Sequence, residues 1–261
     1  MLDCVSGGEK EEKWYVAPAL VETGVKEGDG EEEGVWAFTN HIFVASTRDG
    51  GLAPYLTRLN GREMRCWNER SVDDPKFASR GNWSLSKSGT KEGRKEGEGM
   101  LEVKCQCGGI DFRISRPTSD DALPAHIRPG DPLRWIGQHC ACTSCCLSTS
   151  TPISSWIYVP TGAVTASLSS LPATAYQSSQ GVTRSFCGTC GTCVCVVRED
   201  EPGVVQIAAG LVRAKGARAE DWVEWKGEIG GVEEKGEHGM GSVVEALRKG
   251  LRAGVGAGES V

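Results

Sequence analysis

Eight cysteines in three short clusters constrain this chain more than any other feature of its sequence. The clusters are Cys105 and Cys107, then Cys140, Cys142, Cys145 and Cys146, then Cys187 and Cys190. Cysteines two or three residues apart are typical ligands of zinc in intracellular proteins. Two pairs and one crowded group therefore predict two zinc sites of different character.

Composition excludes several classes of partner. The chain has 261 residues, of which 39% are hydrophobic, so it can bury a core. Asp3, Glu9, Glu11 and Glu12 lie where a signal peptide needs an apolar run, so we expect reduced thiols in a cytoplasmic protein. No stretch approaches the roughly 20 apolar residues of a membrane span. A net charge of −6 gives no attraction to nucleic acid, so we expect neither nucleic acid nor a membrane as partner.

The pattern along the chain predicts a mainly β protein. Residues 71–100 are charged and Gly-rich, which indicates a linker. Residues 101–230 contain short β-like runs broken by Gly and Pro, without alternation of strands and helices. Residues 231–261 are expected to form a flexible tail with a short amphipathic helix over Ser242–Leu251. The expected strands are Leu101–Cys107, Ile110–Ile114, Ser154–Val159, Thr192–Val197 and Val204–Leu211, with a strand-like Val35–Ala45.

The two cysteine pairs predict one closed metal site. On a strand, Cys105 and Cys107 would point to the same face. Cys187 and Cys190 have the C-x-x-C spacing of a zinc knuckle, in which backbone amides can hydrogen-bond the thiolates. Four thiolates suit a structural zinc, which would tie the start of the domain to a distant strand. The alternative is a coincidence of buried free thiols.

The middle cluster predicts a different kind of site. Cys140, Cys142 and Cys145 lie within six residues, so one loop could supply three ligands. His139 and Cys146 are candidates for a fourth ligand, but each is adjacent to a proposed ligand and would need a sharp bend. A zinc ion with three thiolates and an open position could bind a substrate thiol and lower its pKa. Spacing alone leaves open a second structural site or a redox site.

Three motifs resemble the glutathione-dependent formaldehyde-activating enzyme family, also called the CENP-V/GFA domain. They are KCQCGGIDF at 104–112, HCACTSCC at 139–146 and SFCGTCGT at 185–192. The segments 156–160, 176–186 and 206–212 are similar to the family as well, so the resemblance covers about 101–225. It implies a zinc-bound, mainly β architecture similar to the Mss4-like fold.

The resemblance also implies a role for each cluster and two Zn²⁺ ions per chain. Cys105, Cys107, Cys187 and Cys190 would hold a structural zinc, and Cys140, Cys142 and Cys145 would hold a catalytic one. In the family's namesake reaction, glutathione adds to formaldehyde to give S-hydroxymethylglutathione, a carbon–sulfur bond step classed with the lyases. The implied mechanism is zinc-assisted thiolate formation and attack on a small carbonyl carbon, with a small thiol and a small aldehyde as partners.

Two departures from the family bear on activity. The family usually has Arg after the last cysteine of the triplet, where this chain has Cys146, and the lost guanidinium weakens anion recognition. Residues 1–70 resemble an incomplete first copy of a fungal-type tandem domain, through HIFVASTRDGGLAPYL at 41–56. These departures keep open a noncatalytic zinc scaffold or interaction module. A thiol redox protein using the same cysteines is a third alternative.

Overall fold

The computed structural model describes residues 38–47, 49–68, 99–118, 121, 123–166, 171–232 and 241–256. In this part the chain is mainly β, as predicted, with two α-helices, α1 (Thr143–Thr149) and α2 (Gly241–Gly256). The strands are β1 (Asn40–His41), β2 (Arg58–Leu59), β3 (Arg62–Glu63), β4 (Arg65–Cys66), β5 (Met100–Lys104), β6 (Asp111–Ser115), β7 (Trp135–Cys140), β8 (Ser154–Pro160), β9 (Ala173–Ser179), β10 (Val182–Cys187), β11 (Cys193–Arg198), β12 (Val204–Ala208) and β13 (Val223–Gly230).

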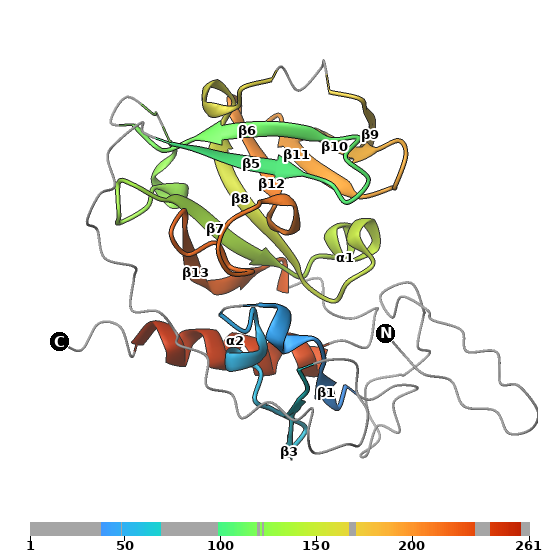
Figure 1. The fold of residues 1–261 in the computed structure, drawn as a ribbon, viewed down its shortest axis with the longest axis vertical. Helices are drawn as coiled ribbons and strands as arrows, with labels where there is room; N and C mark the ends of the chain where they lie inside the picture. The colour runs from blue at the N-terminus through green and yellow to red at the C-terminus, as the bar shows by residue number, and fades with distance from the viewer. Residues whose placement is uncertain are drawn as a thin grey trace, which may run out of the picture.

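A seven-stranded sheet forms the centre of the fold. Its strand order is β13-β7-β8-β12-β11-β10-β9, and every neighbouring pair is antiparallel except the parallel pair β13 and β7. The β5–β6 hairpin lies across one face of this sheet (Figure 1). The main core fills the space between hairpin and sheet, where Val103 and Phe112 of the hairpin meet Ile157 and Val159 of β8. Because side chains alternate along β8, Trp156 belongs to a smaller cluster on the opposite face.

Helix α2 packs with the N-terminal segment in a second core beneath β13. Val243, Leu247 and Leu251 recur every four residues, so they share one face of the helix. That face contacts Ile229 of β13 and apolar side chains of residues 52–64, and Figure 1 shows this blue segment beside the red helix. The carboxylate of Asp49 accepts hydrogen bonds from the backbone N–H groups of residues 217 and 218, at 3.1 and 2.8 Å. The N-terminal segment therefore has polar contacts with the loop before β13 as well as apolar contacts with β13 and α2.

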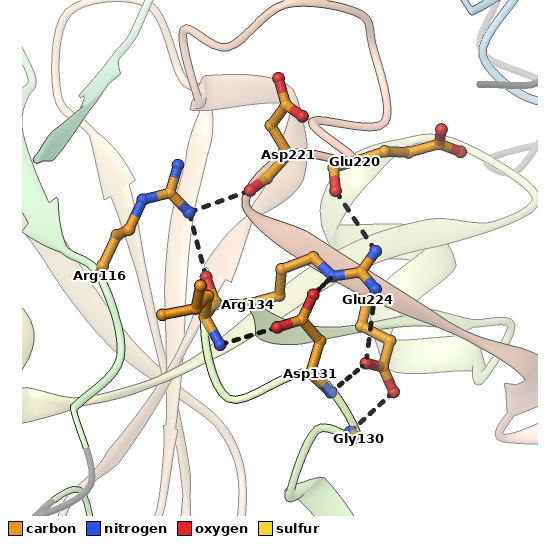
Figure 2. A network of polar contacts seen from close by, with 8 residues as sticks. Arg116, Gly130, Asp131, Arg134, Glu220, Asp221 and Glu224 are labelled. Atoms are coloured by element: carbon orange, nitrogen blue, oxygen red, sulfur yellow. Dashed lines mark hydrogen bonds and ion pairs between the residues drawn. The ribbon is translucent and has the colours of Figure 1, made fainter. Parts of the chain in front are cut away.

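A polar network fixes the start of the parallel pair β7 and β13 (Figure 2). Arg116 donates through one terminal nitrogen to the carbonyls of Leu133 and Asp221, both at 3.0 Å, and its guanidinium lies 3.8 Å from the ring centroid of Trp222. The carboxylate of Glu224 accepts from the backbone N–H groups of residues 130 and 131. Asp131 pairs with Arg134 at 3.0 Å. These bonds tie together the chain segments that lead into the two parallel strands, which no tight turn can join.

The expected elements are confirmed in part. Strands are found at all five ranges expected between residues 101 and 211, as β5, β6, β8, β11 and β12, and the predicted terminal helix is α2. The expected ranges Leu101–Cys107 and Val204–Leu211 are each three residues too long, because β5 ends at Lys104 and β12 ends at Ala208. Helix α1 was not expected. Residues 35–37 and almost all of the expected linker lie outside the described residues, and of residues 38–45 only Asn40–His41 form a strand.

No described helix is long and apolar enough to cross a bilayer.

Candidate metal centres

The first candidate metal centre joins the turn after β5 to the turn after β10. The sulfurs of Cys105, Cys107, Cys187 and Cys190 all lie within 4.8 Å of one another. Three of the distances are 3.3 Å between Cys105 and Cys107, 3.6 Å between Cys107 and Cys187, and 3.9 Å between Cys105 and Cys187. A zinc ion with four Zn–S bonds of about 2.3 Å needs sulfurs about 3.8 Å apart. The four thiols therefore fit a tetrahedral metal ion.

The local backbone explains why Cys105 and Cys107 face each other. Same-face residues of a strand lie about 6.6 Å apart, too far for sulfurs at 3.3 Å. The chain instead turns after Lys104, with the N–H of Gly108 bonded to the carbonyl of Cys105 at 3.1 Å and Gly108 at a φ of 77°. The N–H of Gly109 points at the Cys107 sulfur at 3.4 Å, and that of residue 110 at the Cys105 sulfur at 3.2 Å. Such N–H···S bonds orient thiolate ligands.

The second pair lies in a similar turn after β10. The N–H of Gly191 donates to the carbonyl of Cys187 at 2.9 Å, and Gly191 has a φ of 71°, a conformation that favours glycine. Hydrogen bonds with the hydroxyl and backbone of Thr192 lower the pKa of the Cys190 thiol to about 6. Cys187 is buried, whereas Cys190 is exposed. The four thiols thus come together from two hairpin turns at the edge of the core.

The second candidate centre is built by one short loop at the end of β7. Cys140 is the last residue of β7, Cys142 precedes helix α1, and Cys145 lies in its first turn. Their sulfurs also lie within 4.8 Å of one another, and the N–H of Cys145 donates to the Cys142 sulfur at 3.4 Å. Cys140 and Cys142 are half-buried and Cys145 is buried. Sulfur donors at these distances suit a soft or borderline metal ion such as zinc.

An arginine from a different strand contacts this loop. Arg184 of β10 places its Nη2 atom 3.4 Å from the Cys145 sulfur and 3.2 Å from the Ser144 hydroxyl. Hydrogen bonds from the Cys140 and Cys142 thiols, together with the charge of Arg184, lower the pKa of the Cys145 thiol to about 2. Hydrogen bonds with the other two thiols raise the pKa of Cys140. Cys145 is therefore the sulfur that most readily carries negative charge.

Neither candidate for a fourth ligand turns toward the three sulfurs. His139 points to the other side of β7, where its ring stacks on Trp225 at 4.6 Å and its Nδ1 atom is 2.9 Å from the Ser155 hydroxyl. Cys146 is buried, and its sulfur donates to the carbonyl of Pro152 at 3.3 Å. Among the described residues, no fourth Cys, His, Asp or Glu joins the group. The loop thus offers three protein ligands.

The spacing of the cysteines does not reveal two residues that contact the three-cysteine loop. Arg184 comes 39 residues after Cys145 and reaches it only through the sheet. The sequence singles out Arg184 only through its position in the segment 176–186, which resembles the formaldehyde-activating enzyme family. Gly231, which follows β13, lies against Cys142, and a Cβ built on it would stand 2.5 Å from the Cys142 Cβ. Nothing in the sequence near either residue indicates the contact.

Comparison with known families identifies the domain that carries both centres. The family described as glutathione-dependent formaldehyde-activating enzyme matches residues 100–226. These residues form a domain of that family. Both cysteine groups lie within this GFA domain, and they fit a zinc-binding, mainly β fold of the Mss4-like type. The N-terminal segment and α2 lie outside the matched range.

One solved structure that matches part of this chain is a structural-genomics crystal structure of a Rhodobacter sphaeroides protein. It is 17% identical, with a TM-score of 0.33, and the match covers 48% of this chain and 99% of that chain. No curated protein matches this chain in sequence.

Proposed function

We propose that the GFA domain is a zinc-dependent carbon–sulfur lyase that joins a small thiol to a small carbonyl carbon. The observation that carries this proposal is the three-cysteine loop, because its three sulfurs converge while His139 and Cys146 point away. A tetrahedral ion held by three protein ligands keeps one position for a substrate, which is the arrangement of catalytic zinc sites. The family's description supports the same activity.

We assign a different role to each group of cysteines. Cys140, Cys142 and Cys145 would hold a catalytic zinc, and the four sulfurs of the two hairpin turns would hold a structural zinc, two ions per chain. The structural ligands are Cys105, Cys107, Cys187 and Cys190. The distances between sulfurs in the four-cysteine group are close to those of a tetrahedron, which supports a closed site. A closed site has no position for substrate, so chemistry belongs to the other loop.

The reaction needs no oxidant or reductant. When bound at the three-cysteine loop, zinc would lower the pKa of a substrate thiol so that the thiol loses its proton near neutral pH. The sulfur attacks the carbonyl carbon, a carbon–sulfur bond forms, and the π electrons of the carbonyl move to its oxygen, which takes up a proton. The chain's part is to fix its three sulfurs by the N–H of Cys145 and by the contact with Arg184. The reverse reaction breaks the same bond.

We propose glutathione as the thiol and formaldehyde as the aldehyde, as the family's description suggests. A cytoplasmic location suits both the thiol and the chain, because the described cysteines are free. We also retain, as proposals, a degenerate first copy over residues 1–70, a linker over 71–100, the zinc domain over 101–230 and a tail over 231–261.

The direct test measures the rate of adduct formation between ¹³C-formaldehyde and glutathione by NMR exchange spectroscopy. The zinc-loaded protein should increase the rate, and Cys142→Ser should remove the increase. Cys146→Ser is the matched control, since it changes a neighbouring buried thiol that lies outside the group, and it should keep the activity. The proposal fails if the zinc-loaded protein changes the rate with none of several thiols and aldehydes.

A noncatalytic zinc scaffold is the second candidate, and the burial of Cys145 favours it, since only 6% of this residue is exposed. A scaffold would bind metal at both groups without changing any reaction rate. The scaffold is favoured if the wild type shows no activity and the Cys142→Ser variant still binds its partner.

A further inference from the structure

Arg184 is a buried cation beside the three-cysteine loop. Only 3% of its surface is exposed, although it lies on β10 near one edge of the sheet. Its Nε atom donates to the Ser178 hydroxyl at 3.1 Å, and its Nη2 atom contacts the Ser144 hydroxyl and the Cys145 sulfur at 3.2 and 3.4 Å. Its Nη1 atom is buried without a hydrogen-bond acceptor among the described residues.

Thiol sulfurs are the main source of negative charge near this guanidinium. Within the described residues, no carboxylate forms an ion pair with Arg184, and its hydrogen-bonding oxygens are neutral hydroxyls. Its carbon Cζ lies 5.8 Å from the ring centroid of Trp156, which gives weak electrostatic support. A buried charge without a counter-charge is costly, so sulfur stabilises this arginine, first the sulfur of Cys145 and then that of Cys193.

The charge balance of a metal centre here gives the arginine a role. Three thiolates around a divalent cation leave a net charge of −1, and a fourth, substrate thiolate would bring it to −2. A guanidinium in contact with one sulfur offsets one of these charges in a partly buried site, where charges interact strongly. Because the guanidinium is planar and held at Nε and Nη2, it also fixes the direction from which it meets Cys145.

We propose that Arg184 is a positioning residue of the three-cysteine centre, which orients Cys145 and offsets the negative charge of a divalent metal bound by three thiolates. This inference rests on the proposed metal site, and not on the identity of the thiol or aldehyde. Arg184 does not act on substrate directly in this arrangement. It makes the centre neutral and thereby favours an anionic sulfur as the fourth ligand.

The test uses the full chain and Co²⁺ alone, because thiolate–Co²⁺ absorption reports the ligands directly. Wild type, Arg184→Gln and Arg184→Lys are titrated with Co²⁺. The control is Arg113→Gln, an identical change at an exposed position on β6. We expect Arg184→Gln to bind the second Co²⁺ at least tenfold more weakly and with a shifted charge-transfer band. We expect Arg184→Lys to recover part of that affinity because it keeps the charge.

The first Co²⁺ equivalent, which reports the four-cysteine group, should be unchanged in all variants and serves as the internal control for folding. The inference is overturned if Arg184→Gln binds both Co²⁺ ions with wild-type affinity and spectrum, or if Arg184→Lys is as impaired as Arg184→Gln. If the wild type itself binds only one Co²⁺, the proposed three-cysteine metal site fails, and the role of Arg184 fails with it.

Discussion

Gly231 and Cys142 lie in direct backbone contact, so that a Cβ on Gly231 would stand 2.5 Å from the Cβ and 2.6 Å from the backbone nitrogen of Cys142. The neighbouring carbonyl of Gly230 accepts a hydrogen bond from the N–H of Ala141 at 2.9 Å. The end of β13 therefore supports the loop that carries the three sulfurs. The loop's shape depends on a glycine 89 residues further along the chain than Cys142.

Gly231→Ala should disturb this loop. The new methyl group would displace Cys142, and alanine is strained at a φ of 68°, so we expect loss of metal from the three-cysteine group and a stability loss of about 2–4 kcal/mol. Metal stoichiometry and urea unfolding measure the two effects. Gly203→Ala is the matched control, since Gly203 has a φ of 80° but nothing within 4 Å of its built Cβ. Equal effects of both changes would mean that backbone strain, and not contact with Cys142, explains the result.

Gly250→Ala should destabilise the protein although it improves helix propensity. Alanine in a helix interior is more favourable than glycine by about 1 kcal/mol. A Cβ on Gly250, however, would overlap the carbonyl oxygen of Tyr55, where α2 meets the N-terminal segment. We therefore expect a lower melting temperature for Gly250→Ala and an unchanged or higher one for Gly241→Ala, whose built Cβ has nothing within 4 Å. Stabilisation by Gly250→Ala would show that α2 does not pack on this segment as described.

Arg116→Leu should weaken the parallel pairing of β7 and β13 (Figure 2). The change removes hydrogen bonds to the carbonyls of Leu133 and Asp221 and the stacking on Trp222. Both bonds are part-buried and have a charged donor, and a hydrogen bond of this kind contributes about 1.5–3 kcal/mol. Urea unfolding should show a loss of this size, compared with no more than about 0.5 kcal/mol for the exposed Arg113→Leu. A stability equal to that of wild type would contradict the role of the network.

Leu247→Ala tests whether the second core contributes to global stability. Leu247 is 1% exposed and lies on the face of α2 that contacts β13 and residues 52–64. Removing a buried leucine side chain typically costs about 2–5 kcal/mol, through lost burial and the cavity that remains. Calorimetry should give one transition at a lower temperature. A separate early transition with the main one unmoved would mean that the second core unfolds independently.

The sequence predicted elements whose apolar residues follow a regular period. Strand β8 alternates around Ile157 and Val159, and α2 repeats apolar residues at helical spacing, so both were expected. Strand β13 also alternates, with Val223, Trp225 and Ile229 between charged residues, although it was not among the expected strands. Strands β7, β9 and β10 have a weaker pattern; β9, for example, is largely exposed along its length. Helix α1 has no apolar period either, and its start depends on the Cys142 sulfur accepting the Cys145 N–H. Local pattern cannot reveal elements that tertiary contacts create.

The candidate centres were predictable to the extent that ligands are close in sequence. Spacing indicated both groups of cysteines, and the structure brings each group together. The two-residue spacing of Cys105 and Cys107 fits a strand as well as a turn, so the pattern alone does not show that β5 ends at Lys104. Cys193 and Cys195 belong to different clusters although they lie two residues apart on β11, because the pairing of β10 and β11 shifts at Ser185 and Phe186.

Arg184 shows most clearly what the sequence could not reveal. Cys146 replaces the arginine expected after the triplet, which suggested a loop without a guanidinium. The structure places a guanidinium 3.4 Å from Cys145, but it belongs to β10. Only the fold relates the two residues.

The measurement that tests the central claim most directly is the zinc stoichiometry of protein purified without added metal, for wild type, Cys142→Ser and Cys187→Ser. We predict two zinc ions per chain in the wild type, one in a folded Cys142→Ser, and loss of the fold in Cys187→Ser, because that residue joins the two hairpins. A wild type with one zinc ion, unaffected by Cys142→Ser, would contradict a metal at the three-cysteine loop and favour the noncatalytic scaffold.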